Sequence, residues 1–121
     1  MPKTILIVEN DVLSMKLLNA LLQYNGYDTI NSIDGSNILA IAQERSLDLI
    51  IMDIKLPVLS GLELTRMLKR DEELKKIPII AVTALAMIGD RENILIAGCD
   101  AYLSKPISIP KFIATVREYL S

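Results

Sequence analysis

The chain has 121 residues with a formal net charge of −2, and 51% of them are hydrophobic. This length predicts one domain with its own core, and the weak charge gives no electrostatic reason to expect nucleic acid or a membrane surface as a partner. No apolar run approaches the ~20 residues of a membrane-spanning helix and no signal region follows the start, so we expect a cytoplasmic protein.

Two scarce residue types limit the chemistry. Cys99 is the only cysteine, so we expect no internal disulfide and interpret Cys99 as a small packed side chain beside the fifth strand. The chain contains no histidine, which excludes an imidazole of its own as base, metal ligand or phosphoryl carrier. Phosphoryl or acid–base chemistry would therefore use carboxylates, lysine, hydroxyl groups or a metal.

Strand and helix patterns alternate five times along the chain. In chain order we expect a strand over 5–8, a helix over 12–25, a strand over 27–32, a helix opened by 34–36, a strand over 49–53, a helix over 61–70, a strand over 79–82, a helix over 87–97, a strand over 101–103 and a helix over 109–120. A charged connection over 71–76 precedes the fourth strand. The first helix is expected to bury Leu17, Leu18, Leu21 and Leu22, and the second strand, which is the most polar, to lie at a sheet edge.

Five strand–helix units predict a doubly wound α/β domain, because right-handed crossovers place helices on both faces of a parallel sheet. A flavodoxin-like, five-stranded order of 2-1-3-4-5 would bring the loops after Val8 and Asp53 to one crevice, where such sheets bind ligands. We expect a single domain over 1–121 without an output domain.

Polar residues follow the predicted strands at this edge of the sheet. Glu9 and Asn10 follow the first strand, Asp53 ends the third, and Thr83 and Lys105 follow the fourth and fifth. Carboxylate and amide oxygens suit a hard cation such as Mg²⁺, and a hydroxyl with an ammonium suits a phosphoryl group. The first turn has no glycine-rich loop, which argues against a flavin or nucleotide.

Each of these residues also has an ordinary structural interpretation. Asp53 and Thr83 could simply end strands, and Lys105 could be a solvated loop residue. Tyr102 could be a core residue with its hydroxyl at the surface. Asp11 is interpreted mainly as the N-cap of the first helix, with a role in the site as an alternative. The functional interpretation depends on finding these residues together.

Taken together, they make the chain resemble the receiver domains of two-component response regulators over essentially its whole length. Thr83 and Lys105 stand 30 and 52 residues after Asp53. The matching features are the acidic turn Glu9-Asn10, the segment Met-Asp-Ile-Lys-Leu-Pro at 52–57, Gly61, Thr83-Ala84, Tyr102 and Lys105-Pro106. Within the family, segments 15–17, 82–84, 98–99 and 104–108 are similar to stand-alone regulators of bacterial cell division.

The resemblance implies that Asp53 accepts a phosphoryl group from the phosphohistidine of a sensor kinase or phosphotransfer protein. It implies a Mg²⁺ or Mn²⁺ ion held by Asp53, Asn10, the backbone carbonyl of Lys55 and, through water, Glu9. Lys105 would pair with the phosphoryl oxygens. Such a protein signals and is not an enzyme, beyond supporting its own phosphorylation and slow dephosphorylation.

The resemblance also implies a switch that partner proteins read. Thr83 would turn its hydroxyl towards the phosphoryl group, and Tyr102 would fill the space that it leaves. Partners would dock on the side of the first helix and on the face of the fourth helix, fifth strand and fifth helix. The bond between Lys105 and Pro106 would be cis.

One position departs from the family pattern. Where the family usually has a second, metal-binding carboxylate, this chain has the neutral Asn10, which should weaken metal binding, and an inward-bent Lys55 side chain would weaken it further. A pseudo-receiver that binds partners without efficient phosphorylation is therefore an alternative. A third candidate, an aspartate-nucleophile phosphohydrolase, needs a carboxylate at the position of Lys55 and a cap domain, and the sequence has neither.

Overall fold

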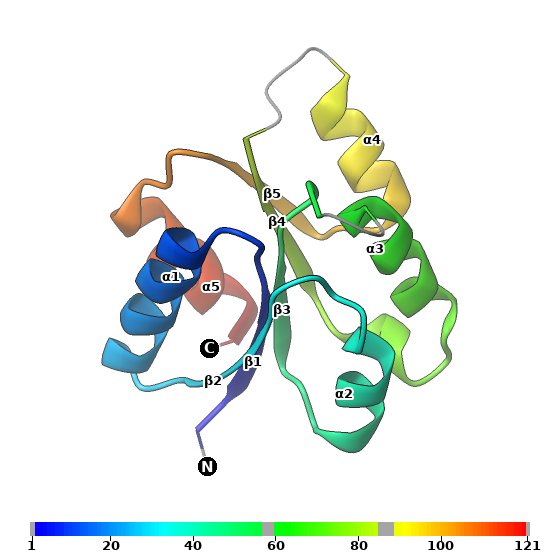
Figure 1. The fold of residues 1–121 in the computed structure, drawn as a ribbon, viewed down its shortest axis with the longest axis horizontal. Coiled ribbons are helices and arrows are strands. Elements are labelled where there is room, and N and C mark those ends of the chain that lie inside the picture. Colours follow the sequence, from blue (N-terminus) through cyan, green and yellow to red (C-terminus); the bar gives the residue numbers. More distant parts are fainter. Residues whose placement is uncertain (1, 57–59, 85–88, 121) are drawn as a thin grey trace.

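The computed structural model describes residues 2–56, 60–84 and 89–120, which form one parallel sheet with α-helices on both faces (Figure 1). The elements are β1 (Thr4–Val8), α1 (Val12–Tyr24), β2 (Asp28–Ser32), α2 (Ile38–Glu44), β3 (Leu49–Met52), α3 (Gly61–Arg70), the 3₁₀-helix η1 (Leu74–Lys76), β4 (Ile79–Thr83), α4 (Asp90–Ala97), β5 (Ala101–Ser104) and α5 (Ile109–Leu120). The strand order is β2-β1-β3-β4-β5 and all pairs are parallel, which confirms the expected fold.

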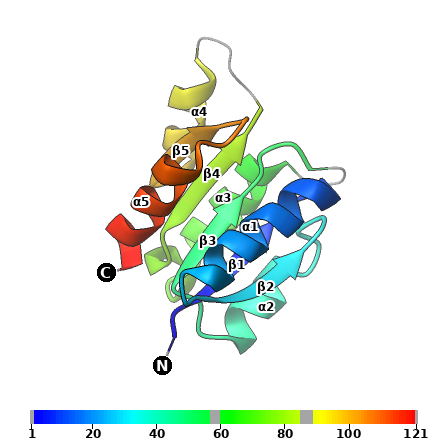
Figure 2. The ribbon, with the colours of Figure 1, turned by 90° about the vertical axis from the view of Figure 1, so that its left-hand side faces the viewer.

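Each face of the sheet carries its own hydrophobic core, because successive side chains of a strand point to opposite faces. Helices α1 and α5 cover one face, where Phe112 is fully buried, and α2, α3 and α4 cover the other, around Leu64 and Leu68 (Figures 1 and 2). Strands β3 and β4 are buried along their whole length, which explains their unbroken apolar runs. The polar strand β2 lies at an edge, as expected.

Helix α1 buries a different stripe from the expected one. Leu18 and Leu22 are buried and Leu21 is half-buried, but Leu17 is 41% exposed, so its assignment to the core was wrong. Met15 is buried instead. Successive residues of a helix are turned by about 100°, so Met15, Leu18 and Leu22 share one face and Leu17 points away from it.

Most element boundaries agree with the sequence analysis, and every strand differs from its expected range by one residue at one end. The connection over 71–76 is an exception, because it contains η1. The carboxylate of Asp71 accepts the backbone N–H groups of Glu73 and Leu74 at 2.9 and 3.1 Å, and the Leu74 side chain is buried. The helix expected from residue 87 begins, in the described part, at Asp90, and residues 87 and 88 lie outside the described ranges. None of the helices in these ranges is long and apolar enough to cross a membrane.

Candidate functional site

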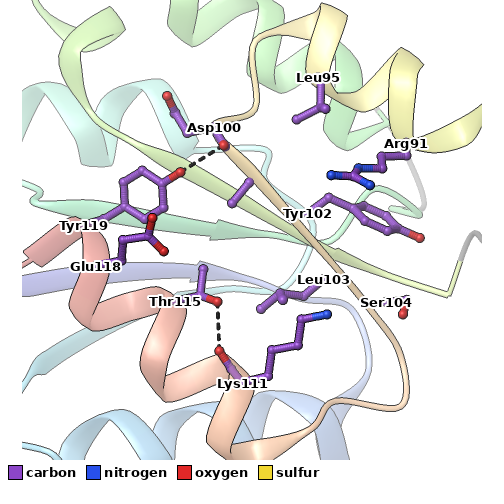
Figure 3. A pocket seen from close by; sticks show the side chains of 11 residues that line it. Arg91, Leu95, Asp100, Tyr102, Leu103, Ser104, Lys111, Thr115, Glu118 and Tyr119 are labelled. Carbon is purple, nitrogen blue, oxygen red and sulfur yellow. Dashed lines mark hydrogen bonds between the residues drawn. The ribbon is translucent and has the colours of Figure 1, made fainter.

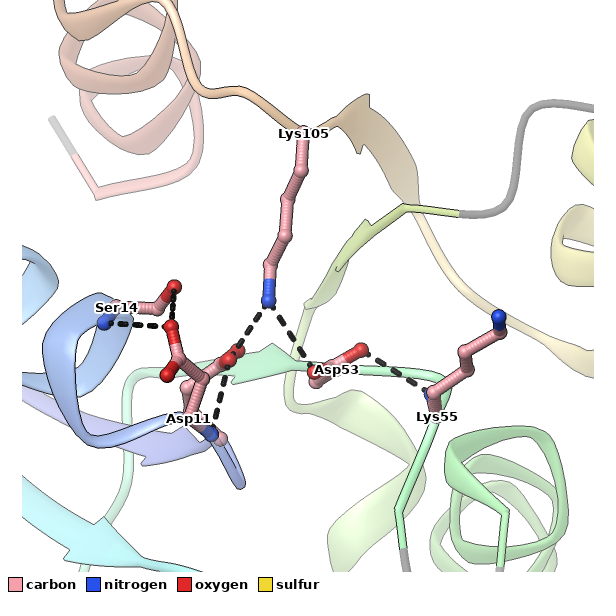
Figure 4. A network of polar contacts seen from close by, with 6 residues as sticks. Asp11, Ser14, Asp53, Lys55 and Lys105 are labelled. Carbon is pink, nitrogen blue, oxygen red and sulfur yellow. Dashed lines mark hydrogen bonds and ion pairs between the residues drawn. The ribbon is translucent and has the colours of Figure 1, made fainter.

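The ammonium group of Lys105 joins two carboxylates at the carboxyl edge of the sheet (Figure 4). Its Nζ lies 2.7 Å from Oε1 of Glu9, which follows β1, and 3.3 Å from Oδ2 of Asp53, which follows β3. Glu9 is only 1% exposed and Asp53 6%. One lysine therefore faces two buried carboxylates, so the cluster carries one net negative charge when all three groups are ionised.

Backbone pairing beyond the strand ends holds these residues in place. The N–H of Asp53 donates to the carbonyl oxygen of Val8 at 2.9 Å, so the β1–β3 ladder extends to the carboxylate. The N–H of Lys105 donates to the carbonyl oxygen of Thr83 at 2.9 Å, which extends the β4–β5 ladder in the same way. The side chains thus start from backbone that is hydrogen-bonded to the sheet, which favours a precise site. The peptide bond from Lys105 to Pro106 is cis, as expected.

The turn after β3 folds back tightly against Asp53. The N–H of Lys55 donates to Oδ1 of Asp53 at 3.1 Å, and the N–H of Gly61 donates to the carbonyl oxygen of Ile54 at 2.8 Å. A Cβ atom on Gly61 would collide with the backbone carbonyl of Asp53 and lie 2.8 Å from Cα of Ile54. Only glycine fits this close approach. The exposed Lys55 side chain points away from Asp53 (Figure 4), so it does not bend inward.

The surroundings of the cluster perturb its titration. Burial raises the pKa of Glu9 above its usual 4.5, and the charge of Asp53 raises it further, whereas Lys105 lowers it. Burial alone would lower the pKa of Lys105, but its hydrogen bond to Glu9 and the charges of Asp53 and Glu9 outweigh this effect and raise the pKa above 10.5. Lys105 is therefore a permanent cation at neutral pH, and its single positive charge does not neutralise both carboxylates when they are ionised.

Thr83 and Tyr102 lie on neighbouring strands beside this cluster. Thr83 ends β4, is fully buried and pairs in register with Ser104 of β5. Tyr102 is half-buried on β5 and packs against the core beneath α2, α3 and α4. The two predicted switch residues thus lie on adjacent strands. Thr83 is at the carboxyl end of β4, next to the point where Lys105 follows β5.

The two carboxylates of the acidic turn after β1 have different partners: Glu9 contacts Lys105, and Asp11 caps helix α1. The carboxylate of Asp11 accepts the N–H of Ser14 at 3.1 Å and its hydroxyl at 2.7 Å, which confirms Asp11 as the N-cap of α1. These bonds lower the pKa of Asp11. Its backbone N–H also reaches Oε1 of Glu9 at 3.4 Å, so Asp11 contacts the site through its main chain. Asn10, between them, is exposed.

Ser32 contributes to the site and was missed in the sequence. Its carbonyl oxygen accepts the N–H of Glu9 at 3.0 Å, and its hydroxyl accepts the N–H of Gly35 at 3.1 Å. Ser32 is 5% exposed. A small polar residue at the end of the second strand was the available signal, but its position beside Glu9 depends on the β1–β2 register.

The donors at this edge are of the kind that bind Mg²⁺, with one charge fewer than usual. In the described ranges, no three residues of the types Asp, Glu, Cys and His gather into a metal-binding group. Glu9 and Asp53 offer two buried carboxylates, and the main chain of Lys55 contacts Asp53. Asn10 follows Glu9 directly and adds an exposed side-chain amide. All of these groups carry hard oxygen ligands. This chemistry fits Mg²⁺ or Mn²⁺.

A parallel sheet of this strand order, with a lysine bridging two carboxylates at its carboxyl edge, is the arrangement of a receiver domain. The family model for the response regulator receiver domain matches residues 5–117. The chain therefore belongs to the response regulator receiver domain family.

Among curated proteins, the chain is 54% identical over 120 residues to the polar-differentiation response regulator DivK of Brucella anthropi, covering 99% of this chain and 98% of that one. DivK of Brucella ovis matches equally well. The receiver domain of the sensor histidine kinase PA1611 from Pseudomonas aeruginosa, solved with a magnesium ion coordinated in its active-site cleft, is 35% identical with a TM-score of 0.90, over 99% of this chain and 98% of that one. A putative response regulator from Chloroflexus aurantiacus has a TM-score of 0.94 at 28% identity, with the same coverage.

Proposed function

We propose that the chain acts as a single-domain response regulator that accepts a phosphoryl group on Asp53 from the phosphohistidine of a sensor kinase or phosphotransfer protein. The observation that carries this proposal is the Lys105 ammonium held between Glu9 and Asp53. An Asp53 carboxylate oxygen bonds to phosphorus while the P–N bond to the donor imidazole breaks, and the departing imidazole takes a proton from water. Lys105 offers positive charge to the phosphoryl oxygens, which is what this loose transition state needs.

Metal binding completes the proposed site. Asp53, Asn10 and the backbone carbonyl of Lys55 would hold Mg²⁺ or Mn²⁺ directly, and Glu9 would hold it through water. When bound, the ion would neutralise part of the phosphoryl charge. The magnesium ion in the receiver domain of the Pseudomonas kinase supports this assignment.

Phosphorylation would be read through Thr83 and Tyr102. The Thr83 hydroxyl would turn towards the phosphoryl group, and Tyr102 would move into the space it leaves, changing the face formed by α4, β5 and α5. The burial of Thr83 and its position one strand from Tyr102 favour this coupling. A small motion becomes a signal only if these elements have two discrete packings.

The phosphodonor would dock beside α1. A pocket of about 250 Å³ lies next to Glu9 and Asn10, and the apolar side chains at its rim are exposed, Val12 by 59% and Ile33 by 61%. Leu13 on the same helix is 75% exposed. Exposed apolar groups of this kind mark interaction surfaces. The similarity to DivK, a polar-differentiation response regulator, supports a role in bacterial development. We propose that the chain signals in the cytoplasm in cell-cycle or cell-division control.

Phosphotransfer profiling tests the proposal. Each histidine kinase of the source genome is autophosphorylated with labelled ATP and mixed with the chain, both alone and together with each phosphotransfer protein of that genome. We expect label to move from at least one kinase to the wild-type chain within minutes, and never to Asp53→Asn. Label on Asp53→Asn, or no transfer from any active kinase to the wild type, would refute it. The second result is the one expected of a pseudo-receiver.

A further inference from the structure

The end of β1, which carries Glu9, is hydrogen-bonded to a strand on each side. On the β3 side, the N–H of Asp53 donates to the carbonyl oxygen of Val8 at 2.9 Å. On the β2 side, the N–H of Glu9 donates to the carbonyl oxygen of Ser32 at 3.0 Å. Strand β3 lies inside the sheet, but β2 is an edge strand that pairs only with β1. The end of an edge strand opens more easily than the inside of a sheet, so the position of Glu9 depends on what fixes the end of β2.

The other edge strand, β5, is fixed at its beginning by side chains. Helix α5 borders β5, and the hydroxyl of Tyr119 donates to the carbonyl oxygen of Asp100, directly before the strand, at 2.9 Å (Figure 3). The carboxylate of Asp100 accepts the N–H of Ile79, the first residue of β4, at 2.8 Å. Side-chain hydrogen bonds thus tie this edge strand to a helix and to its neighbouring strand.

At the end of β2, the hydroxyl of Ser32 makes comparable bonds. It accepts the N–H of Gly35 at 3.1 Å and donates to Oδ1 of Asn37 at 3.1 Å. Asn37 is the N-cap residue of α2, but its side chain makes no capping hydrogen bond and accepts from Ser32 instead. One hydroxyl on a residue that is 5% exposed therefore closes the turn over 32–37 between β2 and α2.

This turn lies against both segments that flank the site. Gly35 is buried with a φ of 74°. A Cβ atom on it would lie 3.4 Å from Cγ1 of Val8 and 3.6 Å from Cδ1 of Leu56. Val8 directly precedes Glu9, and Leu56 directly follows Lys55. The Ser32 hydroxyl thus fixes backbone that lies next to both turns of the proposed metal site.

We propose that Ser32 is a positioning residue for the metal site, and that its hydroxyl sets the affinity for Mg²⁺ by fixing the main chain of Glu9. The inference rests on the metal-binding role of Glu9 in the proposed function. Ser32 acts through its carbonyl oxygen and need not touch the ion. From this fixed main chain, Oε1 of Glu9 accepts Nζ of Lys105 at 2.7 Å and the N–H of Asp11 at 3.4 Å. Residues that orient metal ligands typically change metal affinity by roughly 10- to 100-fold.

Amide hydrogen exchange of the metal-free chain tests how firmly Glu9 is held. Ser32→Ala removes the acceptor of the Gly35 N–H. Exchange at the Glu9 amide should then accelerate at least ~10-fold more than exchange at the Ile50 amide, whose N–H donates to the carbonyl oxygen of Pro78 elsewhere in the sheet. Ser32→Thr keeps a hydroxyl and should restore the wild-type ratio of the two exchange rates.

Calorimetric titration with Mg²⁺ connects the position of Glu9 to metal binding. The affinity should fall about tenfold in Ser32→Ala and return to within about twofold of the wild type in Ser32→Thr. Thr65→Val is the control, because it removes another fully buried hydroxyl, on α3 beside Sγ of Cys99. Its Mg²⁺ affinity and its ratio of exchange rates should match those of the wild type.

Asn37→Ala provides a second variant in case Ser32→Ala does not fold. Asn37 is exposed, and its loss removes only the acceptor that orients the Ser32 hydroxyl. Exchange at Glu9 and the Mg²⁺ affinity should therefore change in the same directions as in Ser32→Ala, by about threefold.

Two kinds of result would overturn the inference. If the wild type binds Mg²⁺ and the folded variant keeps either its Glu9 exchange or its Mg²⁺ affinity, the inference alone fails. The same holds for a Ser32→Thr chain that behaves like Ser32→Ala. A wild type that binds no Mg²⁺ would overturn the proposed metal site together with the inference, so the two failures are distinguishable.

Discussion

At the scale of single residues, the site depends on its balance of charge. Lys105 is the only cation seen against the buried Glu9 and Asp53 among the described residues, and Asn10 adds no charge where the family usually has a carboxylate. The acidic pair raises the pKa of Lys105, and burial keeps the pKa of Glu9 high. Changing either Asn10 or Lys105 should therefore alter the site without altering the sheet beneath it.

Replacing Asn10 by aspartate should strengthen Mg²⁺ binding about tenfold, because a second full charge would lie beside the cation. Calorimetric titration of both proteins measures this. Asn93→Asp, an exposed change of the same charge on α4, is the control and should bind like the wild type. Equal or weaker binding by Asn10→Asp would show that Asn10 is not a ligand.

Lys105→Met should destabilise the fold by about 2 kcal/mol at neutral pH, since it leaves two buried carboxylates without their cation. Lys105 lowers the pKa of Glu9 in the wild type, so the variant should raise it further above 4.5. With its pKa raised, Glu9 is harder to ionise in the folded variant than in the unfolded chain. The free energy of unfolding of the variant should therefore fall further below that of the wild type as the pH rises from 4.5 towards neutrality.

Urea unfolding of Lys105→Met and the wild type at pH 5 and pH 7.5 measures this dependence. Lys76→Met, an exposed lysine outside any ion pair of the described residues, serves as the control. If the loss in free energy of unfolding were the same at both pH values, Lys105 would not affect the pKa of Glu9.

Spacing along the chain located Asp53, Thr83 and Lys105, because residues that follow parallel strands collect at one edge. The contact of Lys105 with Glu9 could not be predicted, since it depends on a side-chain conformation across 96 residues of sequence. The role of Ser32 was hidden for a related reason. Every residue has a backbone carbonyl, so the sequence does not indicate which carbonyl will accept a given hydrogen bond. The β1–β2 register is what places the Ser32 carbonyl oxygen at the N–H of Glu9.

At the scale of elements, the sheet was the predictable part of the fold. Unbroken apolar runs such as 49–52 mark strands covered on both faces, and each strand end was found to within one residue. Helix faces were harder to predict. Leu17 looks like a core residue in sequence, but the packing of α1 favours Met15. The 3₁₀-helix η1 was missed because its single buried leucine gives no periodic signal.

Thr83→Ala tests the link from Asp53 to the face of α4, β5 and α5. The substitution leaves Asp53, Lys105 and the metal ligands intact, so we expect normal phosphorylation by a small phosphodonor. The phosphorylated and unphosphorylated forms should bind a partner kinase with nearly equal affinity, whereas those of the wild type should differ. A Thr83→Ala protein that keeps the full wild-type difference would show that the signal leaves Asp53 by another route.

At the scale of the whole molecule, Cys99 reports opening of the fold. Its side chain is 5% exposed and lies 3.6 Å from the hydroxyl of Thr65. Burial raises the pKa of the thiol above 9.0, so both access and thiolate formation are suppressed in the native state. Alkylation by iodoacetamide should be at least ~100-fold slower in buffer than in denaturing urea. Similar rates in both would mean that the region around α4 and β5 opens readily.

The central claim is that Asp53 accepts the phosphoryl group, and intact-mass measurement after incubation with acetyl phosphate and Mg²⁺ tests it most directly. We predict that the wild type gains the mass of one phosphoryl group, that chelation of the metal prevents the gain, and that Asp53→Asn gains nothing. A wild type that stays unmodified at saturating Mg²⁺, or an Asp53→Asn protein that still gains a phosphoryl group, would contradict the account.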